Sequence, residues 1–172
     1  KFIVSCGIGY DAAVCQEALH SPIKDTLNHL GLGKLTYLGI ALKQLITTPK
    51  SACELWLDDA ADPVKLSKIL FIATMNHRYE GGGFKFCPDA DYTDETFDLC
   101  VAGNIPKAFV LPILPTAFSG KHFRFKGVTP YRAKKIRIHT ALPLWVHTDG
   151  EVKTKADSIL LYQNEEKLSI IS

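Results

Sequence analysis

Several common sequence features are missing from this 172-residue chain. No apolar run approaches the roughly 20 residues that a membrane-spanning helix needs. The P-loop motif G-x-x-x-x-G-K-[ST] does not occur, which argues against that class of nucleotide-binding site. The five cysteines are odd in number and form no C-x-x-C pair. A disulfide-built miniprotein is therefore excluded, and a reducing cytosol is the expected compartment.

The composition that is present is typical of a soluble globular domain. Apolar residues make up 47% of the chain and charged residues 22%, close to the averages for such domains. A chain of 172 residues corresponds to about one domain and can bury a substantial core. It is too short for an enzyme that closes two domains around its substrates. The net charge of +2 indicates no particular partner.

The distribution of charge is more informative than its sum. Residues 80–104 contain six acids and one lysine, whereas residues 119–155 contain nine Lys or Arg and two acids. Such asymmetry is typical of an acidic metal site, or of a basic face for phosphate or anionic lipid. Two oppositely charged surfaces without a specific ligand would give the same pattern.

Hydrophobic periodicity places helices early in the chain and strands later. It predicts helices over 11–18 and 34–46, a further short helix within 21–33, and a helix over 106–118 that Pro112 and Pro115 must kink or break. The predicted strands are 1–5, 52–57, 68–75, 97–102, 123–128, 134–139, 144–148, 158–162 and 167–171. This order predicts the α+β class, a mainly antiparallel β-sandwich with helices inserted mostly in the N-terminal third.

The first candidate motif is Gly7-Ile8-Gly9-Tyr10-Asp11. Glycines before a helix can turn backbone N–H groups toward a phosphate. The same residues can equally form a tight strand-to-helix turn in which Asp11 caps the helix. The sequence favours the turn.

The second motif joins Gly81-Gly82-Gly83 to a run of acids. Three consecutive glycines allow a free turn or a close backbone approach. The acids that follow alternate with small and polar residues, as oxygen ligands of Mg²⁺ or Ca²⁺ often do. A solvated acidic loop remains the alternative.

The third motif is His147-Thr148-Asp149-Gly150-Glu151, where a predicted strand ends. Two carboxylates and a histidine close together suit a general base. Asp-Gly is also a common hairpin turn, and taken alone the hairpin is the simpler interpretation. The basic segment 121–137 carries aromatic residues but no nucleic-acid signature, so no nucleic-acid partner is expected.

Together, and in this order, the motifs resemble one family, the diacylglycerol kinase-like lipid kinases of bacteria, which include sphingosine and ceramide kinases. The matching residues are Phe2, Gly7 to Ala12, Asn76, Gly81 to Gly83, Pro88, Ala90, Asp94, Phe97-Asp98, Gly120 to His122 and Asp149 to Glu151. Each motif is weak alone, but their shared order and spacing extend over almost the whole chain.

The resemblance implies a two-domain enzyme. An N-terminal domain would bind ATP through a G-G-D-G-T motif, which this chain lacks, and a C-terminal β-sandwich would supply the lipid side of the cleft. Residues 1–172 are expected to be that second domain alone, belonging to a longer protein. The expected function of the whole protein is transfer of the γ-phosphate of ATP to a lipid hydroxyl such as that of diacylglycerol. The isolated chain is expected to be inactive.

The resemblance also implies roles for individual residues. Asp149 would be the general base, and Glu151 would orient it or help to hold Mg²⁺ at the phosphates. Asp94, with Asp91 as a second ligand, would hold a structural Mg²⁺. The cleft would be lined by Asn76, Gly81, Gly82 and Gly83. The family usually has glycine after the aspartate of the acidic loop, where this chain has Glu95, and that difference bears on the metal site.

Two other functions stay open at this level. The domain could be a non-catalytic lipid-binding or regulatory module, or its parent could phosphorylate a non-lipid acceptor, as NAD kinases do. For the lipid kinase we expect a cytoplasmic protein at the membrane periphery, with the basic segment around Arg132–Arg137 facing anionic lipid. A homodimer is compatible with the sequence.

Overall fold

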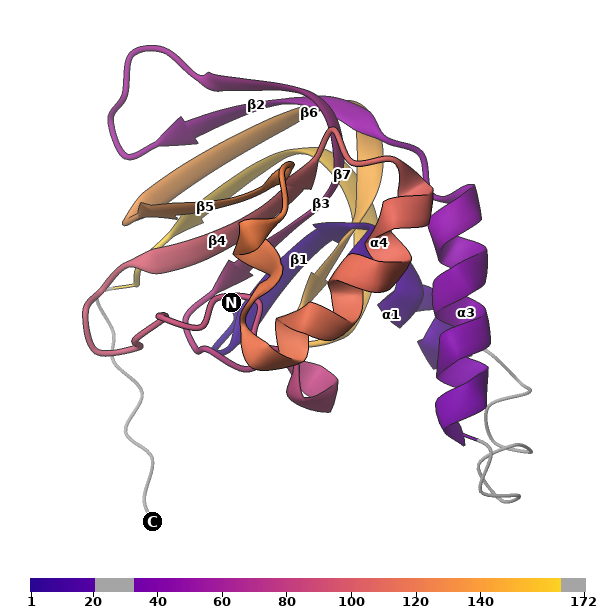
Figure 1. The fold of residues 1–172 in the computed structure, drawn as a ribbon. Helices are drawn as coiled ribbons and strands as arrows, with labels where there is room; N and C mark the ends of the chain where they lie inside the picture. Colours follow the sequence, from indigo (N-terminus) through magenta and orange to yellow (C-terminus); the bar gives the residue numbers. More distant parts are fainter. Residues whose placement is uncertain (21–32, 165–172) are drawn as a thin grey trace.

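The computed structural model describes residues 1–20 and 33–164 (Figure 1). Its strands are β1 (Ser5–Gly9), β2 (Ser51–Leu57), β3 (Val64–Met75), β4 (Phe97–Gly103), β5 (Val128–Ala133), β6 (Lys135–Thr148) and β7 (Glu151–Tyr162). Its helices are α1 (Tyr10–His20), α3 (Gly33–Thr47) and α4 (Lys107–Ile113), with 3₁₀ turns η1 (Gly81–Gly83), η2 (Leu114–Ser119) and η3 (His122–Arg124). None of these helices is long and apolar enough to cross a membrane.

Two long strands close the sheet on itself. The first part of β3 pairs with β2 and the second part with β1. In the same way β6 pairs first with β2 and then with β1, and every pairing is antiparallel. The strands β4 and β5 extend the sheet from β3, and β7 pairs along β6. The predicted antiparallel β-sandwich with inserted helices is confirmed.

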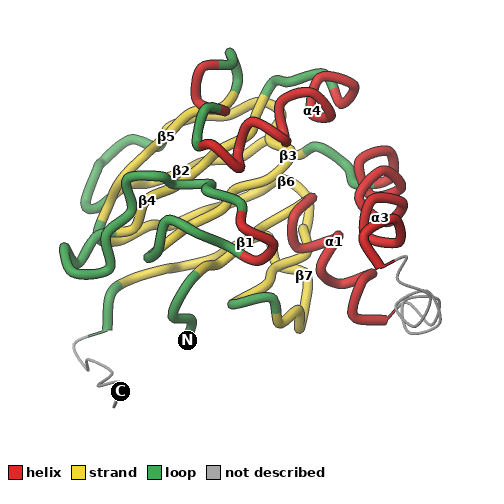
Figure 2. The backbone as a smooth tube through the Cα atoms, turned by 60° about the horizontal axis from the view of Figure 1, so that its bottom comes forward, coloured by secondary structure: helices red, strands yellow, loops and turns green. Residues whose placement is uncertain are grey.

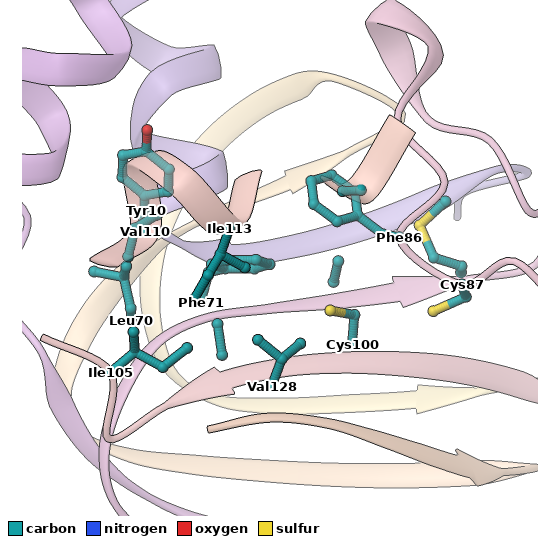
Figure 3. Packing of buried hydrophobic residues seen from close by; sticks show 14 of the residues in the cluster. Tyr10, Leu70, Phe71, Phe86, Cys87, Cys100, Ile105, Val110, Ile113 and Val128 are labelled. Atoms are coloured by element: carbon teal, nitrogen blue, oxygen red, sulfur yellow. The ribbon is translucent and has the colours of Figure 1, made fainter. Parts of the chain in front are cut away.

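Successive side chains of β4 point to opposite faces of the sheet and belong to two separate core clusters. Leu99 and Val101 point into the cluster enclosed by the strands, whereas Cys100 and Ala102 point to the opposite face. That second face is covered from one side by α1, α3 and α4 (Figure 2). Tyr10, Phe71 and Ile113 are among the side chains that meet there (Figure 3). The helices are therefore held by apolar packing on one face of the sheet.

Several predicted boundaries were wrong for identifiable reasons. The first strand was expected over 1–5 but runs over Ser5–Gly9, because Gly7 and Gly9 pair within the sheet and do not form a turn before it. Residues 123–128 were expected to form a strand, but η3 lies there and β5 begins only at Val128.

Other predictions were close to the observed elements. The two strands expected over 134–139 and 144–148 are one strand, β6, whose pairing with β7 shifts register between them. The helix expected over 106–118 changes from α4 to η2 near its prolines, as their missing N–H groups require. The short helix expected within 21–33 and the strand expected over 167–171 lie wholly or mostly outside the described residues.

Candidate active site

The third motif forms a two-residue hairpin turn between β6 and β7. Asp149 and Gly150 both have positive φ, 51° and 85°, and Thr148 pairs with Glu151 across the turn. Positive φ at both central residues is the type I′ geometry, which Asp-Gly favours. The hairpin interpretation is thus confirmed as local structure, and the two carboxylates of the motif lie at its tip.

The carboxylate of Asp149 binds the backbone that leads into β1. Oδ2 accepts the N–H of Ile3 at 2.7 Å, and Oδ1 accepts those of Val4 at 2.8 Å and Ser5 at 2.9 Å. A carboxylate offers about four acceptor sites, so one on Oδ2 remains for another donor. Glu151 is exposed, as is Asp149. The two carboxylates therefore differ in anchoring and not in exposure: Asp149 is held by three backbone N–H groups.

A cluster of polar side chains lies beside this turn and inside the protein. His147 is 1% exposed, and its Nε2 lies 2.7 Å from Oδ2 of Asp11 and 3.6 Å from Oε1 of Glu80. The hydroxyl of Ser5 donates to Oε1 of Glu80 at 2.5 Å, while Oε2 of Glu80 is buried without a partner. The backbone N–H of Gly150 donates to Nδ1 of His147 at 3.2 Å. Residues from four separate segments thus meet in one network.

Glycine at positions 7 and 9 makes this approach possible. A Cβ on Gly7 would lie 2.0 Å from Nε2 of His147 and 2.2 Å from Oδ2 of Asp11. A Cβ on Gly9, whose φ is +92°, would lie 2.4 Å from the carbonyl oxygen of Leu70. The two glycines therefore allow β1 to lie close to the polar network and to β3, because neither has a Cβ. Both glycines lie inside β1 and pair with β3, which is neither of the two arrangements considered for the motif.

Asp11 does not cap α1, because the helix begins at Tyr10 and Asp11 is its second residue. Its side chain binds His147 instead. The sequence analysis did not single out Glu80 or Ser5, and treated His147 only as a neighbour of Asp149. The only signal for this network in the sequence was the glycine pair, which marks a close approach but not its partners.

The network changes the pKa values of its members. Burial raises the pKa of Glu80 to about 7; the charge of Asp11 adds to this rise, and the Ser5 hydrogen bond opposes it. Burial lowers the pKa of His147, but the hydrogen bond and the charge of Asp11 outweigh it, so that its pKa lies above the usual value. Burial also raises the pKa of the Cys15 thiol to about 12. Near neutral pH, the protonation of Glu80 and the protonation of His147 therefore depend on each other.

The shift at Glu80 predicts an unusual dependence of stability on pH. The folded chain keeps this proton up to about pH 7, whereas the unfolded chain loses it near its ordinary value of 4.5. Stability should therefore fall by on the order of 3 kcal/mol as the pH rises through that window. Because the pKa of His147 is also raised in the folded chain, stability should fall further as the pH rises above 6.5.

Urea unfolding of this chain at pH 5, 6, 7 and 8 measures the effect. Glu80→Gln should flatten the slope, whereas Asp62→Asn, at an exposed acid, should leave it unchanged. A slope that is the same in wild type and Glu80→Gln would contradict the assignment.

Among the described residues, one group has potential metal-ligand atoms close together: Asp11, Cys15 and His147, within 4.8 Å. The hydrogen bonds argue against a metal there. Because Gly150 donates to Nδ1, Nε2 carries the proton and has no lone pair for a metal. A histidine ligand normally donates from its other nitrogen, which is the reverse of this arrangement. The raised pKa of Cys15 also keeps its thiol protonated.

The acidic loop predicted to hold Mg²⁺ has most of its oxygens occupied. Oδ1 of Asp91 accepts from the backbone and hydroxyl of Thr93, and Oδ1 of Asp94 accepts from those of Thr96. Oδ2 of Asp94 pairs with the guanidinium of Arg132, a cation already placed where the metal would bind. In the described part of the chain no third His, Cys or acidic ligand joins these two aspartates. With Arg132 on Oδ2 of Asp94, the loop in this form does not fit Mg²⁺.

Glu95 stands where the family usually has glycine and adopts a φ of +59°. This left-handed conformation costs a non-glycine residue about 1 kcal/mol or more. The turn is therefore kept despite the substitution, with Asp94 held by Thr96 and Arg132.

The predicted cleft residues fall into two groups. Asn76 lies close to the Asp149 anchor, since its Nδ2 donates to the carbonyl of Ile3 at 3.2 Å and its backbone N–H to that of Val4 at 2.9 Å. Gly81, Gly82 and Gly83 form the exposed turn η1 directly after Glu80. The structure thus brings Asn76, Asp149 and Glu80, the residue before the glycines, together around residues 3–5. Asp91 and Asp94 instead bind Thr93, Thr96 and Arg132.

Comparison with known proteins identifies the family of the chain. The family model described as "YegS C-terminal NAD kinase beta sandwich-like domain" matches residues 4–162. The chain belongs to this family. The matched range contains all the strands of the described sheet, from β1 to β7.

Similar proteins carry kinase names. The protein named "Putative lipid kinase YtlR" from Bacillus subtilis (strain 168) is 30% identical over 151 residues, which cover 88% of this chain and 48% of that protein. A diacylglycerol kinase from Mycobacterium tuberculosis (strain H37Rv) is 35% identical over 77 residues, 44% of this chain and 24% of that protein. The chain therefore spans about half the length or less of these relatives.

Solved structures agree on the fold. A structure described as "a putative diacylglycerol kinase from Bacillus anthracis str. Sterne" superimposes with a TM-score of 0.59 at 19% identity, covering 94% of this chain and 50% of that one. At that identity the likeness shows the shared sandwich alone. The chain is thus a YegS C-terminal domain, and the relatives that it resembles carry the names of lipid and diacylglycerol kinases.

Proposed function

We propose that this chain is the acceptor-side domain of an ATP-dependent lipid kinase, which transfers the γ-phosphate of ATP to a lipid hydroxyl such as that of diacylglycerol. The observation that carries the proposal is the Asp149-Gly150-Glu151 turn, which places two exposed carboxylates at one hairpin tip, with that of Asp149 anchored by backbone N–H groups. Phosphoryl transfer depends on positioning and on handling one proton of the attacking hydroxyl. The names of the relatives support a lipid as the acceptor.

In this proposal the residues of the chain have distinct tasks. Asp149 holds the segment before β1 and retains one acceptor site on Oδ2 for the lipid hydroxyl. Glu151 is free to orient that hydroxyl or to share its proton. ATP would be bound mainly by a domain that is not part of this sequence. The isolated chain is accordingly proposed to be inactive.

The acceptor is tested with the full-length protein that carries this chain. Purified protein, ATP and Mg²⁺ are incubated with diacylglycerol, sphingosine, ceramide or NAD, and labelled product is measured. Phosphorylation of a lipid is the expected result. Phosphorylation of NAD alone would support the nucleotide-kinase alternative, and no product with any acceptor would support the non-catalytic module.

Two cavities are lined by parts of the fold other than the hairpin at Asp149. One open pocket of about 370 Å³ is lined by β2, β3 and β6, including Glu54 and His139. A small apolar cavity of about 20 Å³ lies beneath α4, lined by Phe71 and Phe86 among others. Neither is lined by Asp149 or Glu151.

We also propose contact with an anionic membrane, through a surface other than the one first expected. In the segment Arg132–Arg137 the cations are already engaged: Arg132 with Asp94, Lys134 with Glu95, Lys135 with Asp59, and Arg137 over the ring of Trp56. Cations that are paired with protein acids have less charge to offer to lipid.

The segment from η2 to β5 is a better candidate for this contact. It presents the exposed cations Lys121, Arg124 and Lys126 beside Phe118 and Phe125, which are 49% and 40% exposed. No acid occurs anywhere between residues 99 and 148. Apolar rings flanked by cations suit the interface of an anionic bilayer, where each well-placed cation contributes about 1 kcal/mol.

Sedimentation with vesicles tests this surface. The chain should bind vesicles containing phosphatidylserine more tightly than pure phosphatidylcholine vesicles. The double variant Lys121→Glu/Arg124→Glu should lose at least about tenfold in that binding, because it reverses two cations that each contribute about 1 kcal/mol. The matched control Lys134→Glu/Lys135→Glu should lose less. Equal losses in both variants, or no preference for anionic vesicles, would contradict the proposal.

A further inference from the structure

The side chain of His147 joins the polar network to the hairpin turn. On one side its Nε2 lies 2.7 Å from Oδ2 of Asp11, and on the other its Nδ1 accepts the backbone N–H of Gly150 at 3.2 Å. The ring is 1% exposed and is enclosed by Gly7, which pairs with it across β1 and β6. Both ring nitrogens therefore have a protein partner.

These partners determine the tautomer of the ring. Because Nδ1 accepts a hydrogen bond from Gly150, its lone pair points to the turn and Nε2 carries a proton. Nε2 then donates to Asp11, and the carboxylate holds the ring in that tautomer and orientation. A buried carboxylate does the same for the histidine of a catalytic triad.

The contact at Gly150 acts on the central residue of the candidate motif. Gly150 lies between Asp149, which is anchored to residues 3–5, and Glu151, whose side chain is exposed. The turn is thus held at two points, by the Asp149 carboxylate and by the ring of His147. The direction in which the Glu151 carboxylate leaves the turn depends on both.

We infer that His147 is a positioning residue, which holds the Asp149-Gly150-Glu151 turn in the geometry needed for phosphoryl transfer while Asp11 holds its ring. The effect on catalysis rests on the proposed function, whereas the tautomer and the hydrogen bonds do not. Nothing in this role requires His147 to touch the substrate.

The tautomer is tested on this chain without any activity. In a long-range ¹H–¹⁵N spectrum recorded at a pH above the raised pKa of His147, where the ring is neutral, the His147 signal should show a protonated Nε2 and an unprotonated Nδ1. The signal is identified by its loss in His147→Asn. In Asp11→Ala that single tautomer should give way to a mixture. A protonated Nδ1 in the wild-type chain would overturn the inference.

The positioning effect is tested in the full-length protein with two complementary variants. In His147→Asn the amide oxygen replaces Nδ1 as acceptor for Gly150, but the bond to Asp11 is lost. In His147→Gln the amide nitrogen replaces Nε2 as donor to Asp11, but Gly150 loses its acceptor. We expect kcat to fall by about tenfold or more in His147→Gln and by less than about threefold in His147→Asn, since small displacements of a reacting group cost that much. KM for ATP and lipid should change little in either variant.

The outcomes separate this inference from the proposed function. A wild-type protein that phosphorylates no acceptor would refute the proposed function and, with it, the catalytic part of the inference, but the tautomer would still be measured. An active wild type with unchanged kcat in His147→Gln would overturn positioning alone. Equal loss of thermal stability in both variants, without the difference in kcat, would show a purely structural role and also overturn it.

Discussion

The Asp149→Asn variant of the full-length protein is expected to lose phosphorylation by about 10²- to 10⁴-fold, the usual contribution of a general base. The structure adds a second expected effect. An amide nitrogen in place of Oδ2 would face the N–H of Ile3 and lose that hydrogen bond. Since hydrogen bonds to a charged group contribute about 1.5–3 kcal/mol, the chain should also become less stable by about that amount.

Glu151→Gln separates the two roles within the turn. The exposed Glu151 side chain can be replaced without a change in stability beyond about 0.5 kcal/mol. If Glu151 orients the acceptor hydroxyl or shares its proton, activity should nevertheless fall. Asp149→Asn is therefore expected to lose both stability and activity, and Glu151→Gln to lose activity alone.

Both effects are measured with the same pair of assays: lipid phosphorylation by the full-length protein and urea unfolding of this chain. Asp157→Asn, at an exposed acid of β7, is the control and should change neither. Undiminished activity in Asp149→Asn would refute its assignment as base. Activity lost only in Glu151→Gln would move proton acceptance to Glu151 and leave Asp149 as the anchor.

Replacing Gly7 by alanine is expected to destabilise the chain strongly. The added Cβ would lie 2.0 Å from Nε2 of His147 and 2.5 Å from its Cδ2, in a site where His147 is 1% exposed. Neither β1 nor β6 can move aside freely, because Gly7 pairs with Ala73 on one side and His147 on the other. The bond between Asp11 and His147 must break, leaving buried polar groups unpaired.

Overpacking and an unpaired buried polar group each cost about 1–3 kcal/mol, so Gly7→Ala should lose at least about 3 kcal/mol of unfolding free energy. Urea unfolding of this chain measures it. The matched control is Gly81→Ala, where a Cβ would meet nothing within 4 Å, and it should stay within about 0.5 kcal/mol of wild type. A Gly7→Ala chain as stable as Gly81→Ala would show that the network tolerates displacement.

Elements with a local signal could be predicted from the sequence. The helix over 34–46 is observed as Gly33–Thr47, because apolar residues recur at helical spacing there. Asp149-Gly150 forms the hairpin that its residue types favour. The strand predicted over 123–128 failed because alternating aromatic and basic residues resemble a half-buried strand, whereas in the fold Phe123 packs against the helix-side core and Phe125 is exposed.

The candidate site could be predicted only in part. The sequence and its family resemblance singled out Asp149, Glu151, Asn76 and the glycines before Phe84. They did not indicate that Arg132 would neutralise Asp94, since the two are brought together by the pairing of β4 with β5. Nor did they assign Glu80 a role, because a lone acid before three glycines has no distinctive local pattern.

By itself, then, the sequence determined the fold class, the hairpin at Asp149 and the family resemblance, since periodicity, turn chemistry and motif order are local along the chain. Only the tertiary structure decided which polar groups meet. Ser5, Asp11, Glu80 and His147 make contacts that join residues as far as 136 positions apart, and the closed pairing of β1 with β3 and β6 brings them together. Contacts of that kind depend on the register of strands far apart in the chain, which the residue types alone do not specify.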